Sequence, residues 1–335
     1  MRTARIRLPA SLDSLSIEQG PEPLTVAGKV KVRWHALSLN FHDYAVAAGL
    51  LPTADGRIPM SDGAGEIVEV GAGVAEWQVG DRVMSLFFPD WLDGEPTAAT
   101  TARLGGDSTD GCATEFSLVD PKALTRMPAG YSYAEAATLP CAALTAWRGL
   151  VAIGRIKAGD QVLVEGTGGV SIFALQFAKA FGATVYATSA SPAKIGRLRQ
   201  LGAVEVVDYR ADPNWGDTIN RLSDGGVDHV IDVGGSSTLD QSISAVRVNG
   251  SVVLIGILGG LTAEINIAKL LMKQQRIRPI AVGSRAMQRD MVAAIEAWGL
   301  KPVIDSVFPF ARLADAFRHQ WSGQHFGKIV VDLDA

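Results

Sequence analysis

Two different patterns of hydrophobic and polar positions follow one another along the chain. Up to about Val119, short β-type runs such as Lys29–Trp34 and Gly65–Gly71 alternate with breaks at Gly, Pro, Asp and Asn. This pattern predicts a compact, mostly antiparallel β region, with Met1–Pro9 as its first strand. The stretch Glu95–Gly111 is polar and rich in Gly and Thr, which predicts a long surface loop.

From Ser132 onward, short apolar strands alternate with helical stretches. Strands separated by crossover helices form parallel sheets that are covered on both faces. This part of the chain therefore predicts an α/β fold with a doubly wound parallel sheet. The expected strands are Gln161–Glu165, Thr184–Ala187, Val204–Asp208, His229–Val233 and Ser251–Ile255, and the expected helices are Ile172–Phe181, Pro192–Leu201 and Leu239–Val246.

The end of the chain returns to β-type runs. Arg285–Trp298 is expected to be helical, and Val303–Phe308 and Lys328–Asp332 are expected to be strands that rejoin the first β region. A chain of 335 residues is longer than a single hydrophobic core usually supports. We therefore expect two domains, a mostly β domain from residues 1–125 and 286–335 and a doubly wound domain from residues 126–285.

Composition and charge exclude several classes of function. With 31 basic and 35 acidic residues the net charge is -4, and no dense Lys/Arg block is present, so a nucleic-acid partner is not expected. No apolar run reaches the roughly 18 to 20 residues that a membrane span needs, and the N-terminus does not resemble a signal peptide. The two cysteines cannot form a disulfide framework, so we expect a cytoplasmic protein.

A glycine-rich turn between a strand and a helix is the strongest single motif. The strand Val162–Glu165 leads into the turn, and the helix from Ile172 follows it. Glycines let the backbone approach a pyrophosphate, which would sit on the unpaired N–H groups at the positive end of the helix. A lone glycine triplet is usually only a turn, but this setting favours a dinucleotide site. Its predicted residues are Gly166, Thr167, Gly168, Gly169 and Val170, with Ser171 in place of a third glycine.

The end of the next strand suggests which dinucleotide binds. An NAD-selective site would place Asp or Glu there, about 20 residues after the glycine turn. The sequence instead has hydroxyls at Thr188, Ser189 and Ser191, followed by Lys194 and Arg197, which suit the 2′-phosphate of NADP(H) better than NAD(H). An alternative is an ordinary helix start, with Ser191 as the N-cap, Pro192 at the first position and solvated basic residues beyond. Both interpretations can hold together.

Several further motifs resemble the medium-chain dehydrogenase/reductase superfamily, specifically its zinc-free members related to quinone oxidoreductases and zinc-independent alcohol dehydrogenases. The resemblance covers nearly the whole chain. It implies a GroES-like catalytic domain, formed by residues 1–125 and 286–335, and a Rossmann dinucleotide-binding domain, formed by residues 126–285. The motifs that carry it, besides the glycine turn, are Ser38–Asp43, Asp62–Val68, Val79–Val83, Leu139–Trp147, Leu201–Ala203 and Gly327–Val330.

The resemblance also implies roles for single residues. Asn40 and Thr145 would lie near the nicotinamide, and Lys194 and Tyr209 near the 2′-phosphate. The rest of the cofactor site would be lined by Gly235, Gly256, Val282, Ser284 and Lys328. Relatives are usually homodimers or homotetramers, often paired through a strand that would correspond to Arg278–Val282.

The positions that hold zinc in zinc-dependent relatives are mostly filled by other residues. Those relatives place a Cys near position 40, a His-Glu pair before the Gly-x-Gly, and a Cys or Asp near position 141; this chain has Asn40, Ser61-Asp62 and Cys141. Tetrahedral zinc needs about three protein ligands, so we expect no zinc, with Cys141 as a small buried helical residue. The four-cysteine structural zinc cluster is also absent, because the 90–112 region contains only Cys112.

Without a metal, hydrogen-bond donors such as the Asn40 amide must stabilise the negative charge that develops on the substrate oxygen. His42 falls where zinc relatives carry the Ser or Thr that relays a proton, so it is a candidate proton donor, and Tyr44 is a weaker one. His42 could instead be a loop histidine bonded to Asp43 or exposed to solvent. The candidate catalytic residues are thus Asn40, His42, Tyr44 and Thr145.

A conjugated acceptor needs the least help, because charge spreads onto a remote oxygen. The sequence therefore favours an NADP(H)-dependent oxidoreductase that reduces a quinone, an α,β-unsaturated carbonyl or a carbonyl. One alternative is a zinc-free NAD(P)-dependent alcohol dehydrogenase acting on a secondary or apolar alcohol. Another is a non-catalytic NADPH-binding protein. Aromatic and aliphatic residues in Phe87–Trp91 and Leu258–Leu261 suggest an apolar, bulky ligand, although they could equally belong to the core or to an interface.

Overall fold

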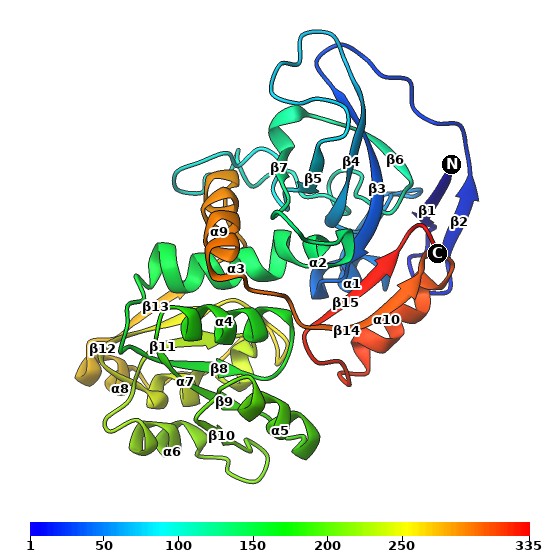
Figure 1. The fold of residues 1–335 in the computed structure, drawn as a ribbon. Helices are drawn as coiled ribbons and strands as arrows, with labels where there is room; N and C mark the ends of the chain where they lie inside the picture. The colour runs from blue at the N-terminus through cyan, green and yellow to red at the C-terminus, as the bar shows by residue number, and fades with distance from the viewer. The chain divides into compact units, whose positions relative to one another are not determined.

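The computed structural model describes all 335 residues, Met1–Ala335. By its internal contacts the chain separates into two compact units, which are described separately below (Figure 1). Unit 1 comprises Met1–Leu144 and Gly283–Ala335, and unit 2 comprises Thr145–Val282. None of the helices has the length and apolar character that a membrane crossing requires.

Unit 1 is built on a seven-stranded sheet with the order β14-β15-β3-β4-β5-β7, and β6 also pairs with β3. Its last strand, β15, runs antiparallel to β3, so the end of the chain lies in the sheet of the N-terminal region as the pattern predicts. The strands are β3 (Val30–Ser38), β4 (Asp62–Val70), β5 (Arg82–Ser85), β6 (Phe116–Val119), β7 (Leu124–Arg126), β14 (Ile304–Pro309) and β15 (Lys328–Asp332), and a separate hairpin pairs β1 (Arg2–Ile6) with β2 (Leu15–Gln19).

Helices cap and cover this sheet. Helix α1 (Phe41–Ala47) begins at Asn40, whose backbone N–H donates to the Asp43 carboxylate at 3.0 Å. Helix α9 (Arg285–Trp298) matches the predicted range, because Ser284 caps its start and Gly299, at φ +61°, ends it. The others are α2 (Tyr133–Ala137), α10 (Leu313–Trp321), a π-helical turn at Leu139–Ala143 and 3₁₀ turns at Pro121–Ala123 and Phe310–Arg312, while residues 95–111 contain no helix or strand.

Unit 2 is a doubly wound α/β fold, as predicted. All strands of its six-stranded sheet pair in parallel, in the order β10-β9-β8-β11-β12-β13. They are β8 (Gln161–Glu165), β9 (Thr184–Thr188), β10 (Glu205–Val207), β11 (Val227–Asp232), β12 (Val246–Leu254) and β13 (Arg276–Pro279). Strand order reverses between β8 and β11, and open α/β sheets bind ligands at the carboxyl ends of strands at such a point.

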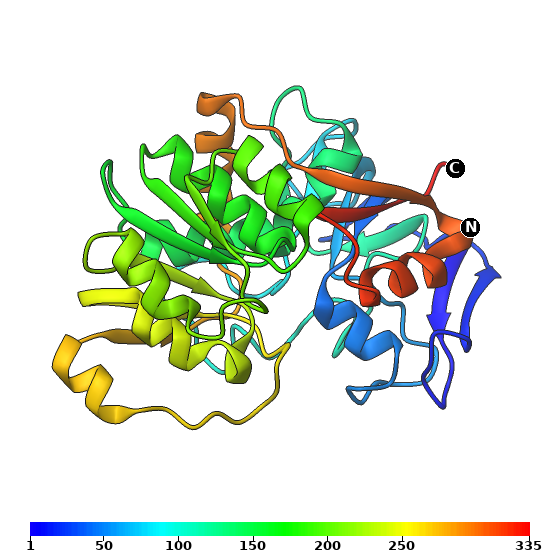
Figure 2. The ribbon, with the colours of Figure 1, turned by 90° about the horizontal axis from the view of Figure 1, so that it is seen from below.

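Short helices connect these strands. They are α3 (Leu144–Trp147), which continues as a π-helical stretch (Arg148–Ile153), and α4 (Gly169–Ala180), α5 (Pro192–Gln200), α6 (Trp215–Leu222), α7 (Leu239–Ala245) and α8 (Ile267–Lys273), with a 3₁₀ turn at Gly235–Ser237. Helices α6 and α8 were not predicted, and the last predicted strand begins earlier, at Val246. Figure 2 shows the yellow-to-orange segment from the end of β12 through α8 to β13 at the edge of this unit.

Candidate functional site

The glycine turn of unit 2 lies at the carboxyl end of β8. The backbone N–H of Gly166 donates to the carbonyl of Thr188 at 2.9 Å, and its φ of +69° is one that glycine adopts without strain. A Cβ added at Gly166 or Gly168 would meet nothing within 4 Å, so this face of the turn is open. Helix α4 begins at Gly169, and its first N–H groups therefore remain available to an anion, which fits the pyrophosphate of a dinucleotide.

Ser171 takes the place of the third glycine and is buried. Its hydroxyl donates to the carbonyl of Glu165 at 2.6 Å, linking the first turn of α4 to the end of β8. The close approach of helix and strand is thus kept by a hydrogen bond rather than by the absence of a side chain.

Most of the predicted cofactor residues of unit 2 gather at one edge of its sheet. Thr188 and Ser189 are buried at the end of β9, Gly235 follows β11, and Gly256 follows β12. A Cβ at Gly256 would approach the Val233 carbonyl to 1.9 Å, so this position admits only glycine. Because the strands are parallel, these residues meet Gly166–Val170 at the carboxyl edge.

The remaining predicted residues are distributed over other elements. In unit 2, Lys194 lies on α5, Tyr209 is 42% exposed after β10, and Thr145 is buried in α3. Val282 is buried with φ +45°. Ser284 and Lys328 belong to unit 1.

A buried acidic chain behind the glycine turn was not foreseen from the sequence. The Ser242 hydroxyl lies 2.5 Å from Glu165 Oε1 and 2.8 Å from Asp232 Oδ2. Burial and the neighbouring Asp232 hold the pKa of Glu165 well above its usual range. Asp232 Oδ1 also accepts the backbone N–H of Gly235 at 2.8 Å, so the chain connects the two turns that follow β8 and β11.

A second buried polar cluster lies in unit 1, around Asn40. The Lys328 ammonium, itself buried, donates to the Leu39 carbonyl at 2.5 Å and to Asn40 Oδ1 at 2.6 Å. Asn40 Nδ2 donates to Ser61 Oγ at 3.2 Å, and Ser61 Oγ donates to Asp62 Oδ1 at 2.9 Å. The structure thereby brings the predicted residues Asn40 and Lys328 into direct contact.

Two carboxyl groups adjoin this cluster. Burial raises the pKa of Asp62 to about 6, although the Lys328 charge opposes the shift. The pKa of Asp43 is also raised by burial, against the opposing effect of His42. The second oxygen of Asp62 accepts the backbone N–H of Cys141 at 3.0 Å. The expectation that Cys141 is buried is wrong: it is partly exposed, whereas the other four residues of its π-helical turn are buried.

These residues do not fit a zinc ion. No group of three or more His, Cys, Asp and Glu side chains in the structure could hold a metal. Asn40 and Ser61 offer neutral oxygens, and Asn40 Oδ1 already accepts a hydrogen bond from the Lys328 ammonium. A divalent cation bound at this oxygen would lie beside a buried positive charge, which Coulomb repulsion disfavours.

The two candidate proton donors have different surroundings. His42 Nε2 lies 3.1 Å from Asp107 Oδ2, and its ring forms a T-shaped pair with Phe87, with centroids 6.0 Å apart. The alternative in which His42 bonds Asp43 is therefore wrong, because Asp43 accepts the backbone N–H groups of Asn40 and Ser61 instead. Tyr44 is buried in the core of unit 1, where it stacks on Trp321 at 4.8 Å.

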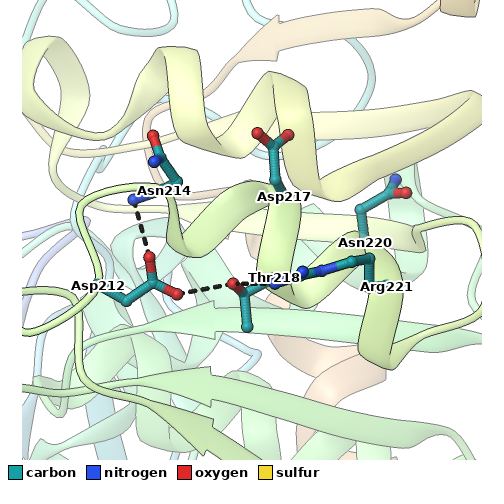
Figure 3. A pocket seen from close by; sticks show the side chains of 6 residues that line it. All are labelled: Asp212, Asn214, Asp217, Thr218, Asn220 and Arg221. Atoms are coloured by element: carbon teal, nitrogen blue, oxygen red, sulfur yellow. Dashed lines mark hydrogen bonds between the residues drawn. The ribbon is translucent and has the colours of Figure 1, made fainter.

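A further hollow in unit 2 contains none of the predicted residues. This cavity of about 480 Å³ is polar and lies along α6, from the residues before the helix to its last turn. Its lining residues largely bond one another, as Asp212 accepts from Asn214 N and Thr218 Oγ1 (Figure 3). The lining consists of Asp212, Asn214, Asp217, Thr218, Asn220 and Arg221.

Comparison with known proteins agrees with this arrangement. Residues 26–129 match the alcohol dehydrogenase GroES-like domain, and residues 169–297 match the zinc-binding dehydrogenase model. A zinc-type alcohol dehydrogenase-like protein of Schizosaccharomyces pombe is 42% identical, with 97% of each chain covered. A crystal structure from Sinorhizobium meliloti is 36% identical with a TM-score of 0.93 and 99% coverage of both chains. That of an NAD-dependent alcohol dehydrogenase is 29% identical with a TM-score of 0.91, covering 99% of this chain and all of that one.

The chain belongs to the medium-chain dehydrogenase/reductase superfamily, with the GroES-like and Rossmann-like parts that this fold combines. It is an NAD(P)H-dependent oxidoreductase. The word zinc in the names of the family model and of the yeast relative contrasts with the donor set around Asn40 in this chain.

Proposed function

We propose that the protein is a zinc-independent, NADP(H)-dependent oxidoreductase that transfers a hydride to a small apolar quinone, α,β-unsaturated carbonyl or carbonyl. Residues 126–285 would form the dinucleotide-binding domain, and residues 1–125 with 286–335 the catalytic domain. The observation that carries the proposal is the hydrogen-bonded chain Lys328–Asn40–Ser61–Asp62, in which a buried ammonium accompanies residues at the zinc-ligand positions of relatives.

Asn40 is proposed to stabilise the substrate oxygen. Its Oδ1 accepts a hydrogen bond from Lys328, and its amide nitrogen donates to Ser61 and also interacts with the Asp62 carboxyl group, so a bound substrate oxygen would compete with Asp62 for an amide hydrogen. When bound, the reduced nicotinamide supplies the hydride. We assign the cofactor contacts to Asn40, Thr145, Ser284, Lys328 and the predicted residues of unit 2, and proton transfer to His42. Tyr44 is left out of this assignment, because its ring packs in the aromatic core.

Metal analysis tests zinc independence directly. Protein purified without chelators should contain far less than one zinc per chain and keep its turnover after dialysis against a chelator. One tightly bound zinc per chain, with turnover that disappears on chelation and returns with zinc, would overturn this part of the proposal.

The preference for NADP(H) is supported by the residues after β9. No acid follows this strand, Thr188 and Ser189 supply hydroxyls, and Lys194 lies in the first turns of α5. We expect NADPH to bind more tightly than NADH in a fluorescence titration. Lys194→Ala should weaken NADPH about tenfold and leave NADH unchanged, since one charge-assisted phosphate contact contributes about 1.4 kcal/mol or more. Lys179→Ala is the matched control, because Lys179 lies in the last turn of α4, away from the glycine turn at the start of that helix.

Oxidation of a secondary or apolar alcohol is the second candidate, favoured by the similarity to alcohol dehydrogenases. A panel of quinones, enones, aldehydes and secondary alcohols, assayed with the preferred cofactor, separates the two. Turnover confined to alcohols and simple carbonyls would favour the second candidate, and turnover of quinones or enones would favour the first.

We also propose that the protein is a cytoplasmic homodimer or homotetramer. Large apolar side chains are exposed on and before α8, among them Leu261 (84%), Leu271 (72%) and Met272 (81%), and the outer edge of β13 is unpaired within the chain. Exposed apolar patches next to an open strand edge favour association. Leu271→Glu should shift the mass measured by light scattering toward the monomer, and cell fractionation tests the location.

A further inference from the structure

The loop at residues 95–111 is packed against the segment that carries Ser61. Backbone N–H groups of Gly111 and Cys112 donate to the carbonyls of Ile58 and Met60 at 2.8 and 2.7 Å. A Cβ at Gly106 would come within 2.7 Å of the Met60 backbone nitrogen, so the loop backbone lies directly on this segment. The loop is therefore fixed with respect to the polar cluster of unit 1.

Within this loop, residues 104–109 form a tight turn that presents one carboxylate. Gly106 N donates to the Thr109 carbonyl at 2.9 Å, and Leu104 N donates to Ser108 Oγ at 2.8 Å. The turn places Asp107 Oδ2 3.1 Å from His42 Nε2. Both side chains are more than two-thirds buried, at 29% and 28% exposure, so water only partly screens this contact.

The contact determines which imidazole nitrogen carries hydrogen. A carboxylate only accepts hydrogen bonds, so Nε2 of His42 must be protonated in both charge states of the ring. Nδ1 is then the nitrogen that gains or loses a proton. Asp43, on the same helix, also interacts electrostatically with His42, and its carboxyl group accepts the backbone N–H groups of Asn40 and Ser61.

We propose that Asp107 is a positioning residue that sets the tautomer and the orientation of His42, so that Nδ1 exchanges the proton with the substrate oxygen. This inference rests on the proposed function. In carbonyl reduction the hydride from the bound cofactor forms the new C–H bond, and the C–O π pair moves to oxygen. His42 Nδ1 gives its proton to that oxygen, and the neutral ring regains a proton from solvent. In alcohol oxidation the same nitrogen accepts the hydroxyl proton.

Four variants test the pair: His42→Gln, Asp107→Asn, their double variant and Asp107→Glu. We expect His42→Gln to lower kcat for carbonyl reduction about 100-fold or more, since a general acid contributes 10²–10⁴-fold. Asp107→Asn should lower kcat about tenfold or more with unchanged NADPH affinity, because the Asn amide can donate to Nε2 and favour the wrong tautomer. The double variant should be no slower than His42→Gln, and Asp107→Glu should regain part of kcat.

Asp110→Asn is the matched control, because Asp110 lies in the same loop and bonds Arg57 and the Ile58 backbone rather than His42. Equal losses in Asp110→Asn and Asp107→Asn, or a further loss from Asp107→Asn in the His42→Gln background, would overturn the proposal.

A readout independent of activity separates this inference from the proposed function. Nitrogen-15 NMR of the imidazole should show hydrogen on Nε2 in the wild type and a shift toward Nδ1–H in Asp107→Asn. An Nδ1–H tautomer in the wild type would refute the role of Asp107, whatever the turnover. Tight NADPH binding without turnover on any substrate class, together with the expected tautomer, would instead refute the proposed reductase and leave the Asp107–His42 coupling standing.

Discussion

In unit 1 the buried carboxyl groups of Asp43 and Asp62 lie near the ammonium of Lys328, whereas in unit 2 those of Glu165 and Asp232 are joined by the hydroxyl of Ser242 and contact no cation. A nearby cation reduces the free-energy cost of a buried carboxylate, and the pKa of Asp62 accordingly rises only to about 6. Where no cation is near, as in unit 2, a bound proton must remove the charge of one buried carboxyl group.

The hydrogen bonds of Ser242 in unit 2 indicate where that proton lies. Ser242 has one hydroxyl hydrogen but lies within hydrogen-bond distance of both carboxyl groups. One of the two contacts therefore needs a proton on a carboxyl group, and the direction in which burial and Asp232 shift the pKa of Glu165 favours Glu165 as its carrier. A neutral Glu165 also adds no negative charge beneath the turn that is proposed to bind pyrophosphate. Unit 1 thus uses a fixed charge where unit 2 uses a bound proton.

Removal of the fixed charge should have the largest effect. Lys328→Met leaves the Leu39 carbonyl and Asn40 Oδ1 buried without their donor, near two carboxyl groups. We expect the free energy of unfolding to fall by about 3 to 5 kcal/mol, as measured by urea denaturation. Lys29→Met, which removes an exposed pair with Asp120, is the control and should cost about 1 kcal/mol or less. Similar losses in the two variants would show that the buried Lys328 ammonium contributes no more than an exposed ion pair.

The pH dependence of Asp62 should come next. Its pKa rises from 3.8 to about 6 on folding, so the folded state holds the proton more tightly. The resulting stability is complete below pH 3.8, is lost as pH rises through about 6 and is constant above it. The shift corresponds to about 3 kcal/mol. Urea denaturation at several pH values should therefore show that the free energy of unfolding of Asp62→Asn, relative to that of the wild type, increases by about 3 kcal/mol between pH 4 and pH 7. A difference that does not change with pH would contradict the prediction.

Loss of the hydroxyl in unit 2 should have the smallest effect of the three. Ser242→Ala separates Glu165 from Asp232 and leaves Glu165 Oε1 without its partner, which should cost about 1 to 2 kcal/mol. Ser223→Ala is the control, because its buried hydroxyl bonds carbonyls of its own helix, and it should cost about 1 kcal/mol or less. A thermal shift equal in both variants would show that the shared proton contributes nothing.

Local patterns predicted much of the fold. The glycine turn between β8 and α4 could be predicted because its strand, turn and helix are contiguous in the sequence. Helix α9 was predicted to the residue, since Ser284 and Gly299 mark its ends. Helix α8 was missed although Ile267, Leu270 and Leu271 recur at helical spacing, because its seven residues are shorter than the roughly 11 to 18 residues over which a helical period is recognised. Of its apolar side chains only Leu270 packs against the core of unit 2.

The site was less accessible to sequence reasoning, because its contacts join distant residues. Lys328 meets Asn40 across 288 positions only because β15 pairs with the end of β3. Asp107 reaches His42 through a loop whose path depends on packing against Met60. Such contacts follow from strand pairing and loop geometry, which residue spacing does not encode, and family resemblance supplied Asn40 and Lys328 but not Asp107.

The backbone of Val282 links the stability of this protein to its turnover. A β-branched residue at φ +45° is strained by roughly 1 to 3 kcal/mol, and Val282 is buried while its carbonyl accepts an N–H of Arg148 at 3.2 Å. Glycine would relax this backbone at the cost of the side chain. Selection for heat resistance alone should therefore replace the valine, whereas selection for turnover should retain it if its methyl groups shape the cofactor site. The two selections would therefore favour different residues at position 282.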